Sequence, residues 1–88
     1  MTTFENLTAL QEVNFAFNLA KSPDFVKLCA ETSKLVGFTA SEWNNNKVAI
    51  CVKYAFLLVQ DAQNGVDKAV QTVNAILSQN SEYINELD

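Results

Sequence analysis

FTASEW, beginning at Phe38, contains two signals that mark the start of an α-helix. Thr39 and Glu42 have the T-x-x-E spacing of a capping box, in which each side chain accepts a hydrogen bond from the other residue's backbone N–H. Phe38 and Trp43 occupy the two positions of a hydrophobic staple, a contact that fixes the angle at which the chain enters the helix. Both signals predict a helix that begins at Ala40.

The residues after this start predict a long helix with a wide apolar face. Several residue types between 47 and 59 also favour strands. A strand, however, would place Lys53 on a face with apolar neighbours, whereas a helical wheel places it on the polar side, exposed to solvent. The apolar residues then form two adjacent stripes, as expected of a helix over residues 40–63 that is buried on two sides. The first stripe is Val48, Cys51, Val52, Ala55, Leu58, Val59 and Ala62, and the second is Trp43, Ile50, Tyr54 and Leu57.

Proline and glycine divide the rest of the chain into three further helices. The tripeptide SPD at 22–24 combines a helix N-cap, a first-turn proline and an acidic residue that suits the positive end of the helix dipole. Gly37 suits a left-handed residue that ends this helix. The pair Asn64-Gly65 predicts a break after the long helix.

We therefore expect an all-α fold, a compact antiparallel bundle of four helices, because short connections favour antiparallel neighbours. A weak capping box, Thr2-x-x-Glu5, begins the first helix, and the second helix is short. The last helix ends in acidic residues, which is the wrong sign for a helix C-terminus, so its final turns should fray unless something packs on them. The expected helices are approximately 4–21, 23–36, 40–63 and 66–86, in a single domain of residues 1–88.

The missing residue types exclude several classes of function. The chain has 88 residues, with six lysines, ten acidic residues, no arginine and no histidine, and a formal net charge of −4. Histidine is the commonest general base and metal ligand near neutral pH, and arginine is the usual side chain for recognising phosphate and guanine. We expect no catalytic residues, no enzymatic activity, no metal or other cofactor, and no binding to nucleic acid.

The chain also lacks the marks of a secreted or membrane protein. Its N-terminus shows no basic stretch followed by an apolar run, and the longest apolar stretch, Val48 to Val59, is shorter than the ~20 residues that span a bilayer. Cys29 and Cys51 lie on the apolar stripes of different helices and are too few for a disulfide scaffold. We expect a cytoplasmic protein with two buried, reduced thiols and no membrane contact.

More apolar side chains are present than a small domain can bury, since such a domain hides only about two-thirds of its unfolded surface. In the first helix, Leu10, Val13 and Phe17 belong to the expected core stripe, whereas Phe15 and Leu19 lie away from it. Either the fold packs the surplus internally, or the surplus forms a contact surface for another protein or for a second copy in a homodimer. The candidate interface residues are Phe15, Leu19, Trp43, Tyr54, Phe56 and Leu57.

Two functional hypotheses follow from these observations. The first is a small cytoplasmic, non-enzymatic helical interaction module that regulates or inhibits a larger protein through apolar helix faces. Small inhibitors encoded by phages or mobile elements have this character. The alternative is a carrier or sensor of a small apolar ligand, bound between the third and fourth helices. The residues expected to line that pocket are Trp43, Tyr54, Leu57 and Ile76.

Overall fold

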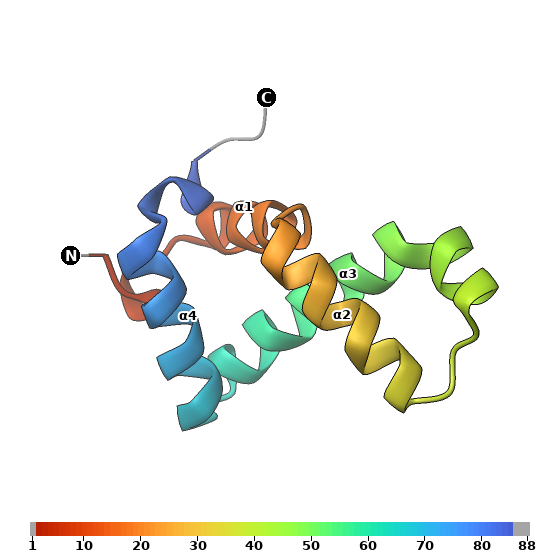
Figure 1. Ribbon diagram of the computed structural model, residues 1–88. Helices are drawn as coiled ribbons and strands as arrows, with labels where there is room; N and C mark the ends of the chain where they lie inside the picture. The colour runs from red at the N-terminus through yellow and green to blue at the C-terminus, as the bar shows by residue number, and fades with distance from the viewer. Residues whose placement is uncertain (1, 86–88) are drawn as a thin grey trace.

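The computed structural model describes residues 2–85, which contain four α-helices and two short 3₁₀ helices and no strand (Figure 1). The α-helices are α1 (Ala9–Ala20), α2 (Pro23–Leu35), α3 (Ala40–Gln63) and α4 (Asp67–Gln79). The 3₁₀ helices are η1 (Phe4–Asn6) and η2 (Ser81–Ile84). The four α-helices pack against one another, so the expected all-α bundle is confirmed.

Helix α3 is the centre of the fold, because α1, α2 and α4 all pack against it. Helices α1 and α2 touch each other only lightly, and α1 is joined to α4 chiefly through η2. In Figure 1, α4 lies beside the C-terminal end of α3, and α2 crosses the middle of α3. Small residues at the buried face of α3 allow the neighbouring helices to approach closely. They include Ala55 and Ala62, which are both buried in the core.

The predicted start of α3 is confirmed in detail. The Thr39 side chain accepts a hydrogen bond from the Glu42 N–H at 3.1 Å, and the Glu42 carboxylate accepts one from the Thr39 N–H at 3.0 Å. The hydrogen bond from the Thr39 backbone lowers the pKa of Glu42, because it favours the charged carboxylate. Gly37 has a positive φ angle of 100°, as predicted for a left-handed residue, and the predicted break at Asn64-Gly65 is present, with Gly65 at φ 80°.

The first helix begins later than predicted. Its capping box is formed by Thr8 and Gln11 instead of Thr2 and Glu5, so α1 starts at Ala9. The residues before it form the separate helix η1, in which Phe4 is buried in the core and its N–H donates to the Asn74 side chain of α4 at 2.8 Å. This tertiary contact turns the N-terminal segment away from the line of α1.

The last helix also ends earlier than predicted. Asn80 leaves the helical conformation, with φ −140° and ψ 68°, and the chain turns into η2. Helix η2, which includes Glu82, then packs on α1. The expected helix end at residue 86 lies outside the described residues.

We predict that Thr39→Ala lowers the free energy of unfolding by about 1 kcal/mol, because it removes the N-cap of the central helix. Thr72→Ala serves as the control. Thr72 is an exposed residue inside α4, where alanine is the better helix former. Urea denaturation followed by circular dichroism measures both values, and equal effects for the two variants would contradict the assignment of the cap.

Candidate functional site

Helix α1 has two apolar faces. The helical periodicity predicted that the face with Phe15 and Leu19 lies outside the core, but this is the face that the structure buries. Phe15 and Leu19 are 0% and 3% exposed, so the prediction that they belong to an exposed contact surface is wrong. Leu10, Val13 and Phe17, the expected core stripe, are instead 59%, 39% and 36% exposed. The apolar surplus of this helix therefore lies on the opposite side from the one predicted.

The physical reason is the segment that covers α1. The Asn18 side chain donates to the backbone carbonyl of Tyr83 at 2.6 Å, and Asn14 donates to that of Ile84 at 3.5 Å. These bonds hold η2 against α1, and the Tyr83 ring packs on Phe15 with centroids 6.3 Å apart. The helical periodicity of α1 does not reveal this arrangement, because asparagine is a polar residue that usually faces solvent.

The other four candidate interface residues remain at least partly accessible. Trp43, Tyr54 and Phe56 are half-buried and pack against the edge of the core, and Leu57 is 41% exposed. Lys53 is exposed, as predicted. The assignment of these four residues to an interface stays a prediction.

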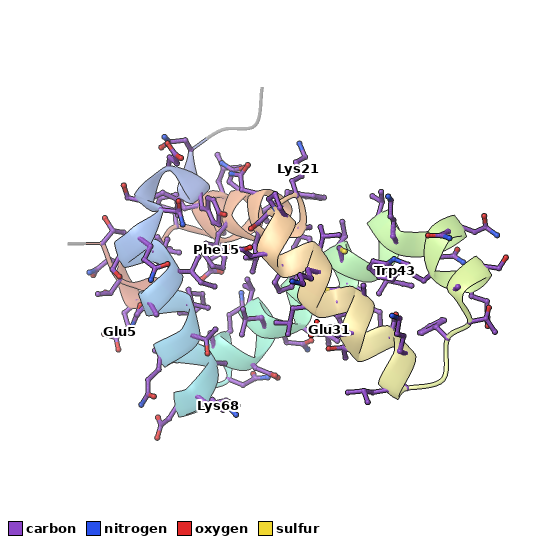
Figure 2. All side chains as sticks on the ribbon, viewed as in Figure 1. Glu5, Phe15, Lys21, Glu31, Trp43 and Lys68 are labelled. Carbon is purple, nitrogen blue, oxygen red and sulfur yellow. The ribbon has the colours of Figure 1, made fainter. Side chains whose placement is uncertain are left out.

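The ligand pocket expected between α3 and α4 is not formed by the four residues predicted to line it. Trp43 lies 21 residues before Asn64 on α3, roughly 30 Å along the helix, whereas Ile76 lies only roughly 15 Å along α4 from the same turn. Figure 2 shows Trp43 at the end of the molecule opposite α4. Ile76 instead borders a hollow with Leu19, Phe25 and Tyr83.

Two neighbouring hollows follow the seam between α1 and α3, and together we call them the α1–α3 groove. Its apolar residues are Val13 and Phe17 on α1 and Val48, Val52 and Phe56 on α3. The rings of Phe17 and Phe56 meet edge to face with centroids 5.3 Å apart, and this pair divides the groove into two hollows.

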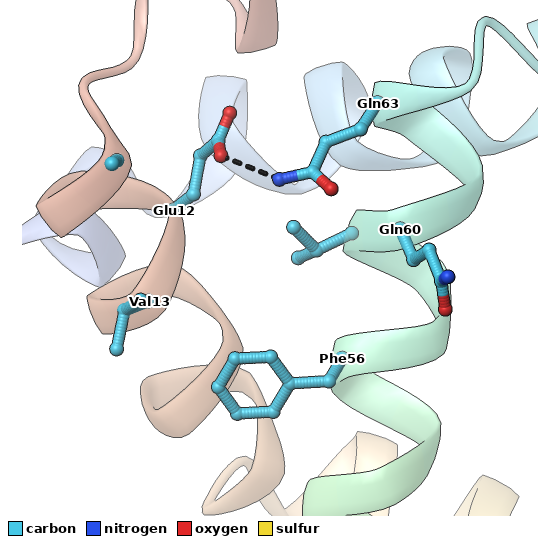
Figure 3. A pocket seen from close by; sticks show the side chains of 7 residues that line it. Glu12, Val13, Phe56, Gln60 and Gln63 are labelled. Carbon is cyan, nitrogen blue, oxygen red and sulfur yellow. Dashed lines mark hydrogen bonds between the residues drawn. The ribbon is translucent and has the colours of Figure 1, made fainter.

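The two hollows have opposite charges at their outer ends. The first, about 380 Å³, lies between Val13 and Phe56, and Figure 3 shows Glu12 and Gln63 closing it with a 2.7 Å hydrogen bond. The second, about 470 Å³, lies between α1, α2 and α3, and both Lys21 and Lys47 border it. The groove is thus apolar along its length, acidic at one end and basic at the other.

The two cysteines face each other between α2 and α3, where both thiols are shielded from solvent. Both thiols are buried and free, as predicted. Burial, together with the neighbouring Cys51, raises the pKa of Cys29 to about 12, and burial also raises the pKa of Cys51. Because the thiolate is the reactive form, the pair serves as two small apolar side chains in the packing of α2 on α3.

The remaining findings concern the described chain as a whole and its comparison with known proteins. Within residues 2–85, no group of three or more histidine, cysteine, aspartate or glutamate side chains is placed to hold a metal ion. No helix in that range has the length and apolarity to cross a bilayer. Comparison with known proteins finds no matching family model, no similar curated protein and no similar solved structure. We take the α1–α3 groove, with its exposed apolar side chains and its opposite charges at the two ends, as the candidate functional site.

A matched pair of substitutions on α1 tests which face is the core. Leu19→Ala should lower the free energy of unfolding by about 2–5 kcal/mol, because it leaves a cavity at a buried position. Leu10→Ala should lower it by less than about 1 kcal/mol, because Leu10 is mostly exposed. Chemical denaturation of the two variants measures the difference, and a larger loss for Leu10→Ala would show that the face assignment is reversed.

We also predict that the native protein reacts slowly with a thiol reagent such as 5,5′-dithiobis(2-nitrobenzoate) at pH 8. Both thiols are buried and protonated there, so labelling requires the chain to open. Urea should raise the rate to that of free cysteine. Rapid labelling without denaturant would contradict the buried assignment.

The raised pKa of Cys29 also predicts that the free energy of unfolding falls as the pH rises above 9, because the unfolded thiols lose their protons before the folded ones do.

Proposed function

We propose that this protein is a small, non-enzymatic helical interaction module that regulates or inhibits its target by protein–protein contact through the α1–α3 groove. The observation that carries the proposal is the exposed apolar stripe of α1, in which Leu10, Val13 and Phe17 recur at helical spacing beside Phe56. Single exposed apolar side chains are common on protein surfaces, but a continuous stripe of them is typical of an interface.

The groove also has the composition of an interface. Its centre contains an aromatic pair among apolar side chains, Gln60 lies along one side, and the charged residues Glu12, Lys21 and Lys47 stand toward its ends. Protein interfaces share this arrangement of an apolar centre with a polar rim, and aromatic residues are enriched in them. The partner is another protein or a second copy of this chain.

The chemistry of the remaining residues supports a role in binding rather than catalysis. The chain has no histidine to act as a base, its two thiols are buried with raised pKa values, and Lys53 is exposed on the polar side of α3. The net charge of −4 and the absence of arginine disfavour nucleic acid and anionic membrane surfaces as partners. Two adjacent free thiols suit the reducing cytoplasm, where we place the protein.

A small apolar ligand is the alternative occupant, and one observation favours it. The hollow between α1, α2 and α3 has a volume of about 470 Å³ and is lined mainly by apolar residues, among them Phe17, Val26 and Val52. This volume falls within the range of small-molecule sites. A carrier function would therefore use this hollow instead of the space between α3 and α4.

Site-specific photocrosslinking in the protein's own cells tests the proposed interface. A benzoylphenylalanine residue at position 10 should crosslink to a protein, whereas one at the exposed position 71 of α4 should not. The crosslink should disappear when Val48→Ser is added, because Val48 lies on the same groove. The Val48 side chain is 73% exposed, so this substitution leaves the core intact. Equal crosslinking at both positions, or none at position 10, would contradict the proposal.

A further inference from the structure

We infer that the α1–α3 groove binds the same groove of a second copy, in a dimer whose two-fold axis passes beside the Phe17–Phe56 pair. The inference rests on the proposed function, since it names the partner of the surface described there. Two properties of the groove support it: the placement of charge at its two ends and the placement of its protruding apolar side chains.

The charges make the groove complementary to itself. Helices α1 and α3 run antiparallel along the seam, so Glu12 beside Gln63 marks one end and Lys21 beside Lys47 marks the other. A two-fold axis perpendicular to the groove reverses its direction in the second copy. Glu12 of each copy then lies over the two lysines of the other, and charges of the same sign are kept apart. Such complementarity sets the register of an interface.

The shape of the groove fits the same arrangement. Leu10 and Val48, 59% and 73% exposed, protrude near opposite ends of the groove. Along their helices Leu10 lies seven residues from Phe17 and Val48 lies eight residues from Phe56, which places both roughly 10–12 Å from the axis. The two-fold axis therefore brings Leu10 of one copy against Val48 of the other, beside the hollow at the lysine end.

By the same symmetry, Val48 of the first copy packs against Leu10 of the second, beside the hollow at the Glu12 end. Each hollow, of about 380 or 470 Å³, has room for an aliphatic side chain. Because the interface is isologous, each of these contacts forms twice, which doubles the apolar area that the dimer removes from water.

Charge reversal tests this dimer on the full chain. Glu12→Lys makes both ends of the groove basic, and the double variant Lys21→Glu/Lys47→Glu makes both ends acidic. Each variant alone should dimerise at least about tenfold more weakly than the unsubstituted protein, because like charges then face each other. An equimolar mixture should form a heterodimer at least as tight as the original dimer, since every contact pairs opposite charges. Sedimentation equilibrium and native mass spectrometry measure both.

Matched controls separate the local effect from net charge. Lys53→Glu/Lys68→Glu changes the net charge as much as the groove double variant does, but alters exposed lysines that do not border the groove. Glu31→Lys is the corresponding control for Glu12→Lys. Both controls should dimerise like the unsubstituted protein at physiological salt. Formation of the heterodimer itself shows that both groove variants are folded.

The possible outcomes distinguish this inference from the proposed function. A monomer at every concentration overturns the two-fold dimer, and so does a mixture that associates no better than its components. A dimer that Val48→Ser disrupts but that charge reversal leaves unchanged overturns the proposed register. If the chain is a monomer but position 10 crosslinks to another protein, the interaction module stands and only the second copy is wrong. A bound mass of a few hundred daltons, lost on denaturation, overturns both in favour of a small ligand.

Discussion

The Asn18 side chain donates to the Tyr83 carbonyl at 2.6 Å, and together with Asn14 it holds η2 across α1. A backbone carbonyl that is removed from water without a donor costs free energy, so these amides allow an irregular segment to lie on an apolar helix. Tyr83 then covers Phe15, and the core closes on that side of α1. The opposite side of the helix stays in contact with solvent.

The remaining architecture follows from the length and composition of α3. Because it is the longest helix, it provides a separate packing surface for each of α1, α2 and α4. Alanines at its buried face permit close approach, and the paired cysteines fill the contact with α2. Along the seam with α1, however, the larger side chains of Phe17 and Phe56 meet at the surface and leave a hollow on either side. The groove is therefore a consequence of how two helices with uneven side chains pack.

This groove connects the fold to the proposed function. Exposing an apolar stripe to water costs a small domain free energy, and binding to a partner removes that apolar surface from water. The opposite charges at the two ends give the groove a direction, which a purely apolar surface would lack. This arrangement of charge affects the register and specificity of binding more than its affinity, since ion pairs at an exposed rim contribute little free energy.

The sequence by itself predicted the helical class, the break at each glycine and the start of the central helix at Ala40. These features depend on residues within a few positions of one another, such as Thr39 and Glu42, whose side chains satisfy the nearest free backbone groups. The positions of the two cysteines on apolar stripes predicted that both thiols are buried, which is confirmed. The number of apolar residues also indicated more apolar surface than a small core can hold.

Only the tertiary structure decided which of those apolar residues are left outside. Helix α1 has two faces of similar apolarity, and no local signal distinguishes them, since the choice depends on amide bonds from Asn14 and Asn18 to a segment more than 60 residues away. The same holds for the early end of α4 and for the late start of α1, where Phe4 bonds Asn74. Hydrogen bonds between residues close in the sequence can be predicted from the sequence. The buried side of a helix with two apolar faces depends instead on which distant segment packs against it.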